Sequence, residues 1–161
     1  MILVADCSAL IALASCDGLH LLDALFGTVI VPEAVYREAV VGDKPEAKQL
    51  KGYLQDKVRK IDPVGSVLLD GFSDLGETEA MLLYKQYLAD KLLIDDKRGR
   101  RVAKINHIST IGSLGVLLAA KQARLIDQIF PFVNKLASSD IYVSADLIST
   151  VMDIAGEEWP R

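Results

Sequence analysis

The sequence contains little cysteine and little histidine, and this scarcity argues against several kinds of site. The two cysteines, Cys7 and Cys16, stand outside any CxxC or cysteine-histidine pattern, so we expect reduced, buried thiols rather than a zinc site. No serine and aspartate are arranged around His20 or His107 as a hydrolytic triad requires, so these histidines are predicted to pack or to lie on the surface. A reaction carried by zinc or by a nucleophilic triad is therefore not expected.

Long apolar runs are also missing, although 51% of the 161 residues are hydrophobic. No run approaches the roughly 18 uninterrupted apolar residues of a membrane-spanning helix, so we expect a soluble chain without a membrane partner. The first residues lack a basic segment and meet Asp6 after a short apolar stretch. This start is unlike a secretory signal and predicts a cytoplasmic location. The length fits one compact domain over residues 1–161.

An excess of positive charge is missing as well, since 18 Lys and Arg stand against 22 Asp and Glu and give a net charge of −4. This balance argues against a protein that grips nucleic acid over its whole surface. One local stripe is basic, because its members are spaced by three, four and seven positions and share a helical face: Lys97, Arg100, Arg101 and Lys104. The stripe can hold a polyanionic backbone, or it is a solvated face whose charges pair with nearby acids.

Short apolar runs alternate with amphipathic segments along the chain. Uninterrupted apolar runs are typical of parallel strands covered on both faces, and they occur at residues 2–5, 28–31, 91–94 and 108–111. Helical patterns occupy residues 8–14, 18–26, 32–41, 45–55, 77–89, 97–106, 114–123, 125–136 and 145–155. The stretch from 42 to 74 has a less clear pattern. The alternation predicts an α/β fold with a parallel sheet and helices on both faces.

Acidic residues directly follow two of the predicted strands. Asp6 comes after the first strand, and Asp95 and Asp96 come after the run at 91–94. The carboxyl ends of parallel strands meet at one edge of a sheet, where open α/β folds bind ligands, so we expect these side chains to lie together. Adjacent carboxylates disfavour each other unless a cation offsets their charge. The alternatives are a helix cap for Asp6 and a solvated turn for the pair.

Two glutamates lie on helical faces that should point to the core. Glu38 follows Val35 by three positions, and Glu77 precedes Met81 by four, so each shares a stripe with apolar residues. Glu79 lies on a partly apolar stripe too and competes with Glu77 for the same role. A favourable interaction with a helix N-terminus is the alternative explanation for each glutamate.

Together these acids predict a metal site. Carboxylate oxygens are the hard ligands that Mg²⁺ or Mn²⁺ prefers, and they would come from Asp6, Glu38, Glu77, Asp95 and Asp96. A metal held there can activate a water molecule and stabilise the charge that develops on a phosphodiester. The sequence therefore predicts hydrolysis by metal-activated water, and the basic stripe favours a nucleic acid as substrate.

Taken in order, the motifs resemble those of a PIN domain. They are Asp6-Cys7-Ser8-Ala9-Leu10, Val35-Tyr36-Arg37-Glu38, Gly76-Glu77 and Leu93-Ile94-Asp95-Asp96. Within that family the chain is most similar to a PIN-like subgroup with a Gly-Glu helix start, an Asp-Asp-Lys/Arg segment and a Gly-x-x-Gly turn, here residues 112–115. The resemblance covers about residues 1–125 and leaves about 126–161 as a C-terminal helical extension.

The resemblance implies a three-layer α/β/α sandwich with a central parallel sheet, acids that bind Mg²⁺ or Mn²⁺, and endonucleolytic cleavage of RNA. Many relatives are toxins of toxin-antitoxin pairs, which implies a homodimer and an antitoxin protein as a partner. The family's acidic positions match Asp6, Glu38, Glu77 and one or both of Asp95 and Asp96, and its small polar residue matches Ser8. Common toxin members have a threonine or serine before a separated aspartate in the last motif, so the fourth ligand is open.

Other function classes compare poorly or stay as alternatives. A receiver domain needs an acid pair near the first strand, but Asp6 is followed by Cys7. A nucleotide-binding fold needs a glycine-rich turn there, and residues 6–11 contain no glycine. A metal-dependent phosphohydrolase of small substrates and a catalytically inactive PIN-like scaffold or partner-binding module remain. The presence of all four acidic positions favours an enzyme over the scaffold.

Overall fold

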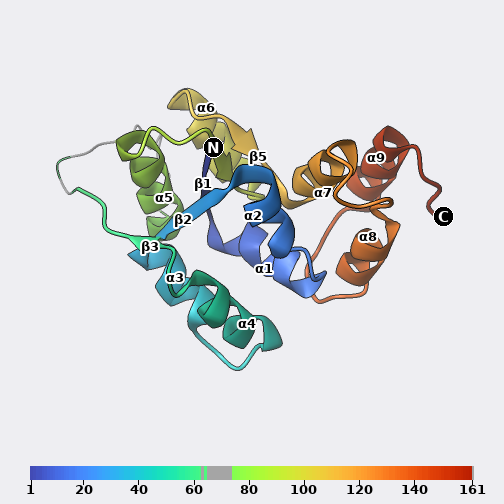
Figure 1. The fold of residues 1–161 in the computed structure, drawn as a ribbon, viewed down its shortest axis with the longest axis horizontal. Helices are drawn as coiled ribbons and strands as arrows, with labels where there is room; N and C mark the ends of the chain where they lie inside the picture. The colour runs from blue at the N-terminus through green and yellow to red at the C-terminus, as the bar shows by residue number, and fades with distance from the viewer. Residues whose placement is uncertain (63, 65–73, 161) are drawn as a thin grey trace.

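The structure is a computed structural model that describes residues 1–62, 64 and 74–160. Within these residues it has a five-stranded, all-parallel sheet with helices on both sides (Figure 1). The sheet order is β3-β2-β1-β4-β5, and the strands are β1 Ile2–Ala5, β2 Thr28–Pro32, β3 Val58–Arg59, β4 Lys91–Leu93 and β5 Thr110–Ile111. The predicted three-layer α/β/α class with a central parallel sheet is confirmed.

The helices of the described residues follow the predicted order. They are α1 Cys7–Ser15, α2 His20–Phe26, α3 Glu33–Val40, α4 Pro45–Leu54, α5 Leu75–Gln86, α6 Lys97–Ile105, α7 Ser113–Gln122, α8 Phe130–Ala137 and α9 Ala145–Ala155. The prediction of a helix from residue 125 was wrong at its start, because Arg124 adopts a left-handed backbone with φ +61° and ends α7 in a turn. Strand β3 was not predicted, since a two-residue edge strand has no apolar run to reveal it.

The core explains why the central strands read as uninterrupted apolar runs. Leu3, Val4 and Ala5 of β1 have no exposed surface, because β1 lies between β2 and β4 and has helices on both sides. Helix α5 packs against β1, β2 and β4, whereas α1 packs against α3, α4, α7 and α8. Strand residues with two covered faces must be apolar throughout, so alternation is absent.

Cys7 and Cys16 are buried and unbonded to each other, as predicted for ordinary reduced cysteines. Burial raises the pKa of the Cys7 thiol to about 12, and nearby Glu38 and Asp6 add to the shift. Burial likewise raises the pKa of Cys16, to about 11. Both thiols therefore stay protonated at neutral pH and have little reactivity.

Glu157 holds the residues that follow α9 in place through hydrogen bonds. Its carboxylate accepts hydrogen bonds from Lys121 Nζ at 2.8 Å and from the backbone N–H groups of Ile129 and Phe130 at 2.9 and 3.0 Å. Burial alone would raise the pKa of Glu157, but these hydrogen bonds outweigh it and lower that pKa. The ring of Trp159 also packs on Phe130, with 5.5 Å between centroids. The residues after α9 are therefore held against α7 and the start of α8.

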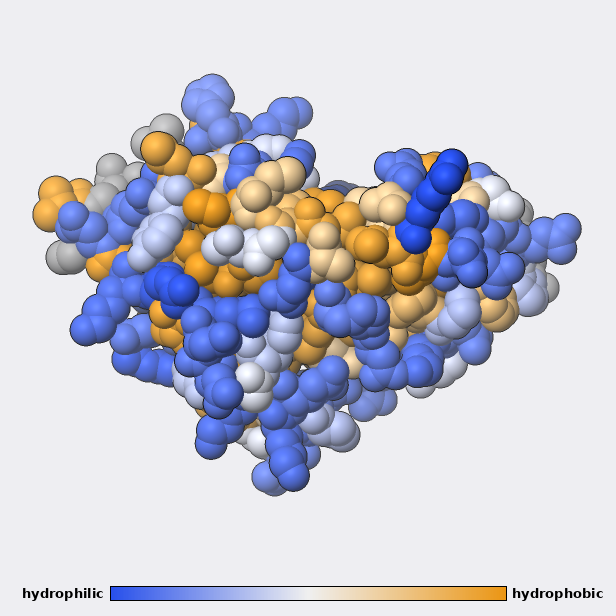
Figure 2. All heavy atoms as spheres, viewed as in Figure 1, coloured by the Kyte–Doolittle hydropathy of each residue, from blue (hydrophilic) through white to orange (hydrophobic). Residues whose placement is uncertain are grey.

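Within the described ranges no single helix is long and apolar enough to cross a membrane. Helices α1 and α2 reach that length and composition only as a pair, and they are bent by 116° at the break between them. Most residues of α1 are buried in the core. Figure 2 shows a band of apolar residues across the middle of one face, with hydrophilic residues gathered around it.

Candidate active site

The carboxyl edge of the sheet brings together acids that are far apart in the sequence. Strands β1 and β4 are neighbours, with Ala5 opposite Leu93, and the backbone N–H of Asp6 donates to the carbonyl of Leu93 at 2.9 Å. The chain therefore leaves β1 through Asp6 and leaves β4 through Asp95 and Asp96 at the same edge. This is the position at which open α/β sheets bind ligands.

Asp6 is a buried carboxylate with only 3% of its surface exposed. It occupies the N-cap position of α1, but its side chain makes no capping hydrogen bond, so the helix-cap alternative does not account for it. Burial raises its pKa to about 7, and repulsion from Asp74 and Glu38 adds to the shift. The Ser8 hydroxyl donates a hydrogen bond to Asp6 Oδ2 at 3.4 Å, and this bond lowers the pKa of Asp6 and so opposes the shift. Asp6 therefore holds a proton over much of the range below neutral pH.

Glu77, at the start of α5, is the second buried acid, with 6% of its surface exposed. Its Oε2 atom is buried and has no hydrogen-bond partner. Burial raises its pKa to about 8, with further repulsion from Asp6 and Asp96. A Cβ on Gly99 would stand 2.5 Å from this oxygen, so glycine is needed there to let α6 approach the carboxylate. An unpartnered buried oxygen is costly and indicates a site shaped for something other than stability.

Asp74 is an acid of this cluster that the sequence did not single out. It caps α5 by accepting a hydrogen bond from the backbone N–H of Glu77 at 2.8 Å, and its charge raises the pKa values of Asp6, Glu38 and Glu77. The signal was present, because an aspartate three residues before a glutamate is a helix-start pattern. Beginning the helix at Glu77 instead of Leu75 left Asp74 outside it.

Glu38 extends the cluster from α3. It is exposed, and its Oε2 atom lies 3.0 Å from the position that a Cβ on Gly76 would take. Partial burial, with added repulsion from Asp74, raises its pKa. Three helices and the end of one strand therefore contribute a cluster of carboxylates with electrostatic repulsion between its members. The cluster consists of Asp6, Glu38, Asp74, Glu77 and Asp96.

The adjacent aspartates after β4 have different partners. Asp95 accepts two hydrogen bonds from Ser113, from its backbone N–H and from its hydroxyl, each at 2.7 Å. Asp96 caps α6 by accepting from the backbone N–H of Gly99 at 2.7 Å, and its charge raises the pKa of Glu77. Asp95 thus ties the end of β4 to the start of α7, whereas Asp96 faces the acidic cluster.

The two competing glutamates of α5 are also separated by the fold. Glu77 faces Asp6 and Asp96, whereas Glu79 lines a different pocket, of about 300 Å³, together with Glu33, Lys60 and Ile61. Residues two positions apart on a helix point in different directions, so only one of them can face the sheet edge.

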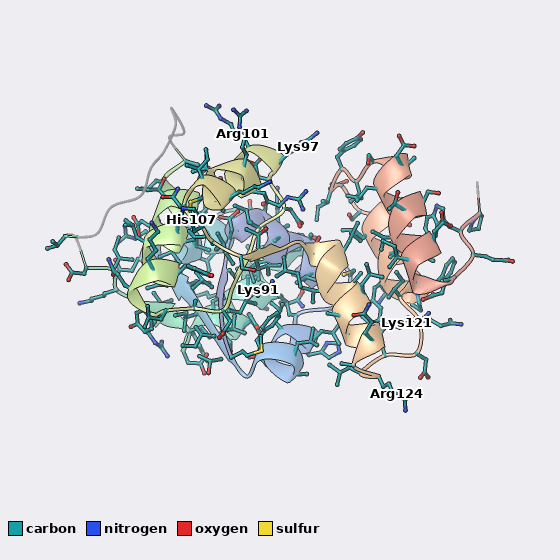
Figure 3. All side chains as sticks on the ribbon, turned by 90° about the horizontal axis from the view of Figure 1, so that it is seen from above. Lys91, Lys97, Arg101, His107, Lys121 and Arg124 are labelled. Atoms are coloured by element: carbon teal, nitrogen blue, oxygen red, sulfur yellow. The ribbon has the colours of Figure 1, made fainter. Side chains whose placement is uncertain are left out.

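The basic stripe lies on α6, which starts at the acidic edge. Its four members are exposed, and Figure 3 shows Lys97 and Arg101 projecting from α6 away from the body of the protein. Arg100 reaches back toward the acids, because a Cβ on Gly112 would stand 3.6 Å from its Nη1 atom and 3.0 Å from Asp95 Oδ1. Cationic groups and carboxylates therefore border the same edge of the sheet.

Comparison with known families identifies the fold. Residues 2–157 match the model of the DUF3368 family, which is described as a PIN domain. The chain belongs to the PIN domain family. The resemblance seen in the sequence motifs is thereby confirmed, and the PIN match extends through α9. Neither a curated protein nor a solved structure matches the chain.

PIN domains are generally nucleases, and they typically use divalent metal ions. In residues 1–62, 64 and 74–160, no three Asp, Glu, His or Cys side chains surround a common point closely enough to hold a metal as they stand. The donors of this PIN domain nevertheless fit a hard cation in their chemistry. They are all carboxylates, they repel one another, and the buried Glu77 Oε2 atom lacks a partner.

Proposed function

We propose that this PIN domain protein is a metal-dependent endoribonuclease whose centre is formed by Asp6, Glu77, Glu38 and Asp96, with Asp74 beside them. The observation that carries the proposal is the buried pair Asp6 and Glu77, whose pKa values are raised to about 7 and about 8 by burial first and by repulsion from neighbouring acids. Such groups are unfavourable in a protein without a cation to offset them. Mg²⁺ or Mn²⁺ is the ion that this donor set favours.

The protein's own residues divide the work in this proposal. A divalent cation, if bound there, would supply an activated water and stabilise charge on the diester. Asp6 and Glu77 would hold the ion through their carboxylate oxygens, and both would have to be ionised to do so. Asp95 positions α7 through Ser113, so Asp96 rather than Asp95 is proposed as the ligand from this aspartate pair. Arg100, whose Nη1 atom and Asp95 Oδ1 both lie near the Cβ position of Gly112, would orient a phosphodiester.

Removal of the metal tests this proposal directly. We expect the purified protein to cleave single-stranded or structured RNA with Mn²⁺ or Mg²⁺, to lose cleavage in excess chelator, and to regain it when the metal returns, as followed on end-labelled RNA. Equal cleavage in excess chelator would contradict the mechanism. Hydrolysis of small phosphomonoesters without cleavage of RNA would instead identify a phosphohydrolase.

A second prediction concerns the stripe on α6. Reversing two charges, Arg100→Glu with Arg101→Glu, is expected to weaken RNA binding and to reduce the slope of log affinity against log salt by about 1 to 2, because each phosphate contact releases a counterion. Binding can be measured by fluorescence anisotropy at several salt concentrations. The control is Arg124→Glu, which follows α7 at the far end of the protein (Figure 3) and should leave the slope unchanged. Unchanged affinity for RNA in the double variant would mean that the stripe is a solvated face and does not bind RNA.

The biological setting of this activity is proposed from the family resemblance alone. A toxin role, an antitoxin partner, a homodimer and a cytoplasmic location all fit a small ribonuclease that a cell must restrain.

A further inference from the structure

A pocket of about 210 Å³ opens next to the acidic cluster, between α1, α3 and α4. Its wall is apolar and carries no aromatic ring, and is formed by Ile11, Ala39, Val41 and Ala47. Its polar groups are the carboxylates of Glu38 and Glu46 and the ammonium group of Lys44. The pocket therefore combines apolar side chains with two acceptors and one strong donor.

Glu38 connects this pocket to the acidic cluster. The same side chain lines the pocket and places its Oε2 atom 3.0 Å from the Cβ position of Gly76, where Asp74 Oδ1 is 3.5 Å away. Cys7, which follows Asp6 directly, forms another part of the lining. A ligand in the pocket would thus lie immediately beside a phosphodiester held at the carboxylates.

We propose that this pocket binds one nucleobase of the RNA, beside the phosphodiester that is cleaved, and that it prefers a base with an exocyclic amino group. The inference rests on the proposed ribonuclease function and adds a specificity site to it. The amino group would donate to the carboxylate of Glu46, as the cytosine N4 amine does to acidic side chains, while Glu38 serves the acidic cluster. Uracil carries a carbonyl oxygen in place of that amine. This oxygen is a hydrogen-bond acceptor and would face the carboxylate, which is an acceptor too.

The volume favours a base over a protein segment. At about 30 Å³ per water molecule, the pocket holds roughly seven waters, which is the scale of one planar ring with its substituents. Pockets for larger ligands usually begin at about 300 Å³, and a helix of a partner protein needs a long groove. Lys44 adds a donor for a base carbonyl, so that a complete base edge can be satisfied.

Nucleotide binding tests the proposal without any need for cleavage. Methyl signals of Ile11, Val41 and Ala47 can be followed by NMR while AMP, CMP, GMP or UMP is added to the protein with Mg²⁺. We expect at least one of the three amino-bearing nucleotides to shift these signals and to bind about fivefold or more tightly than UMP, since one good base-edge contact contributes about that discrimination. Absence of shifts with all four nucleotides, or UMP binding as tightly as the best of them, would overturn the proposal.

Two variants test whether the preference for amino-bearing nucleotides arises in this pocket. Ala47→Leu fills the pocket, and Glu46→Gln keeps its shape but removes one charge; both should reduce the preference over UMP by about fivefold. Gly52→Ala, on the same helix, is the matched control, because a Cβ there meets no atom within 4 Å. If Ala47→Leu does not fold, the test rests on Glu46→Gln. An unchanged preference over UMP in Glu46→Gln contradicts the proposal. Hydrolysis of a base-free phosphodiester by the unsubstituted protein reports the ribonuclease function separately.

Discussion

Asp6→Asn is expected to abolish metal-dependent cleavage of RNA and, in the same protein, to increase stability. The amide has the shape of the carboxylate but cannot neutralise a divalent cation, so we expect a rate loss of about a hundredfold or more, as for other groups that hold catalytic charge. Cleavage by the variant and by the unsubstituted protein, measured at saturating Mn²⁺, provides the test. Full activity in Asp6→Asn would remove Asp6 from the site.

The gain in stability is what distinguishes this site from a structural one. Burial raises the pKa of Asp6 to about 7, so its ionised form destabilises the metal-free fold near pH 8. At 1.36 kcal/mol for each pKa unit, the variant should be more stable there by on the order of 4 kcal/mol in denaturant unfolding. A loss of stability would mean that Asp6 is a structural hydrogen-bonding group instead.

Asp90→Asn is the matched control for this substitution. Asp90 contacts the same strand at its other end, where its Oδ2 atom accepts from the backbone N–H of Ile2 at 2.7 Å. Asp90 is exposed and lies away from the acidic edge, so its substitution should keep cleavage. It should also cost a little stability, through a weakened hydrogen bond, at every pH.

The metal-free protein is expected to lose stability as the pH rises from about 5 to about 8. Burial, with repulsion between the acids, raises the pKa of Asp6 from 3.8 to about 7 and that of Glu77 from 4.5 to about 8. Between the unfolded and the folded values the native state binds more protons than the unfolded state, so the free energy of unfolding falls with increasing pH in this window. The expected loss is on the order of a few kcal/mol, measurable by denaturant unfolding in chelator.

Mn²⁺ should reverse this trend. A cation bound to the ionised carboxylates stabilises the native state, and its affinity rises with pH because protons compete for the same oxygens. The midpoint of unfolding with Mn²⁺ should therefore increase between about pH 6 and about pH 8, while the midpoint in chelator decreases. Parallel pH profiles with and without Mn²⁺ would contradict a metal site at Asp6 and Glu77.

Local patterns predicted the elements that carry the site. The run at residues 2–5 became β1, and the run at 91–94 became β4, because strands covered on both faces must be apolar at every position. The acids that follow these strands could be recognised in the sequence, because each stands directly after an uninterrupted apolar run. Asp74 was missed although it lies next to α5, because its importance depends on Asp6, Glu38 and Glu77 being near it.

The sequence by itself determined the α/β class, the parallel sheet and the PIN resemblance, and it singled out Asp6 as a candidate ligand, because all of these follow from short-range patterns and motif order. Only the tertiary structure decided which of Asp95 and Asp96 faces Glu77, and that Glu79 turns to another pocket. The same holds for the pocket beside Glu38, whose walls come from three helices. Each of these depends on distances between residues that are remote in the chain, and side-chain direction at such distances follows from packing alone.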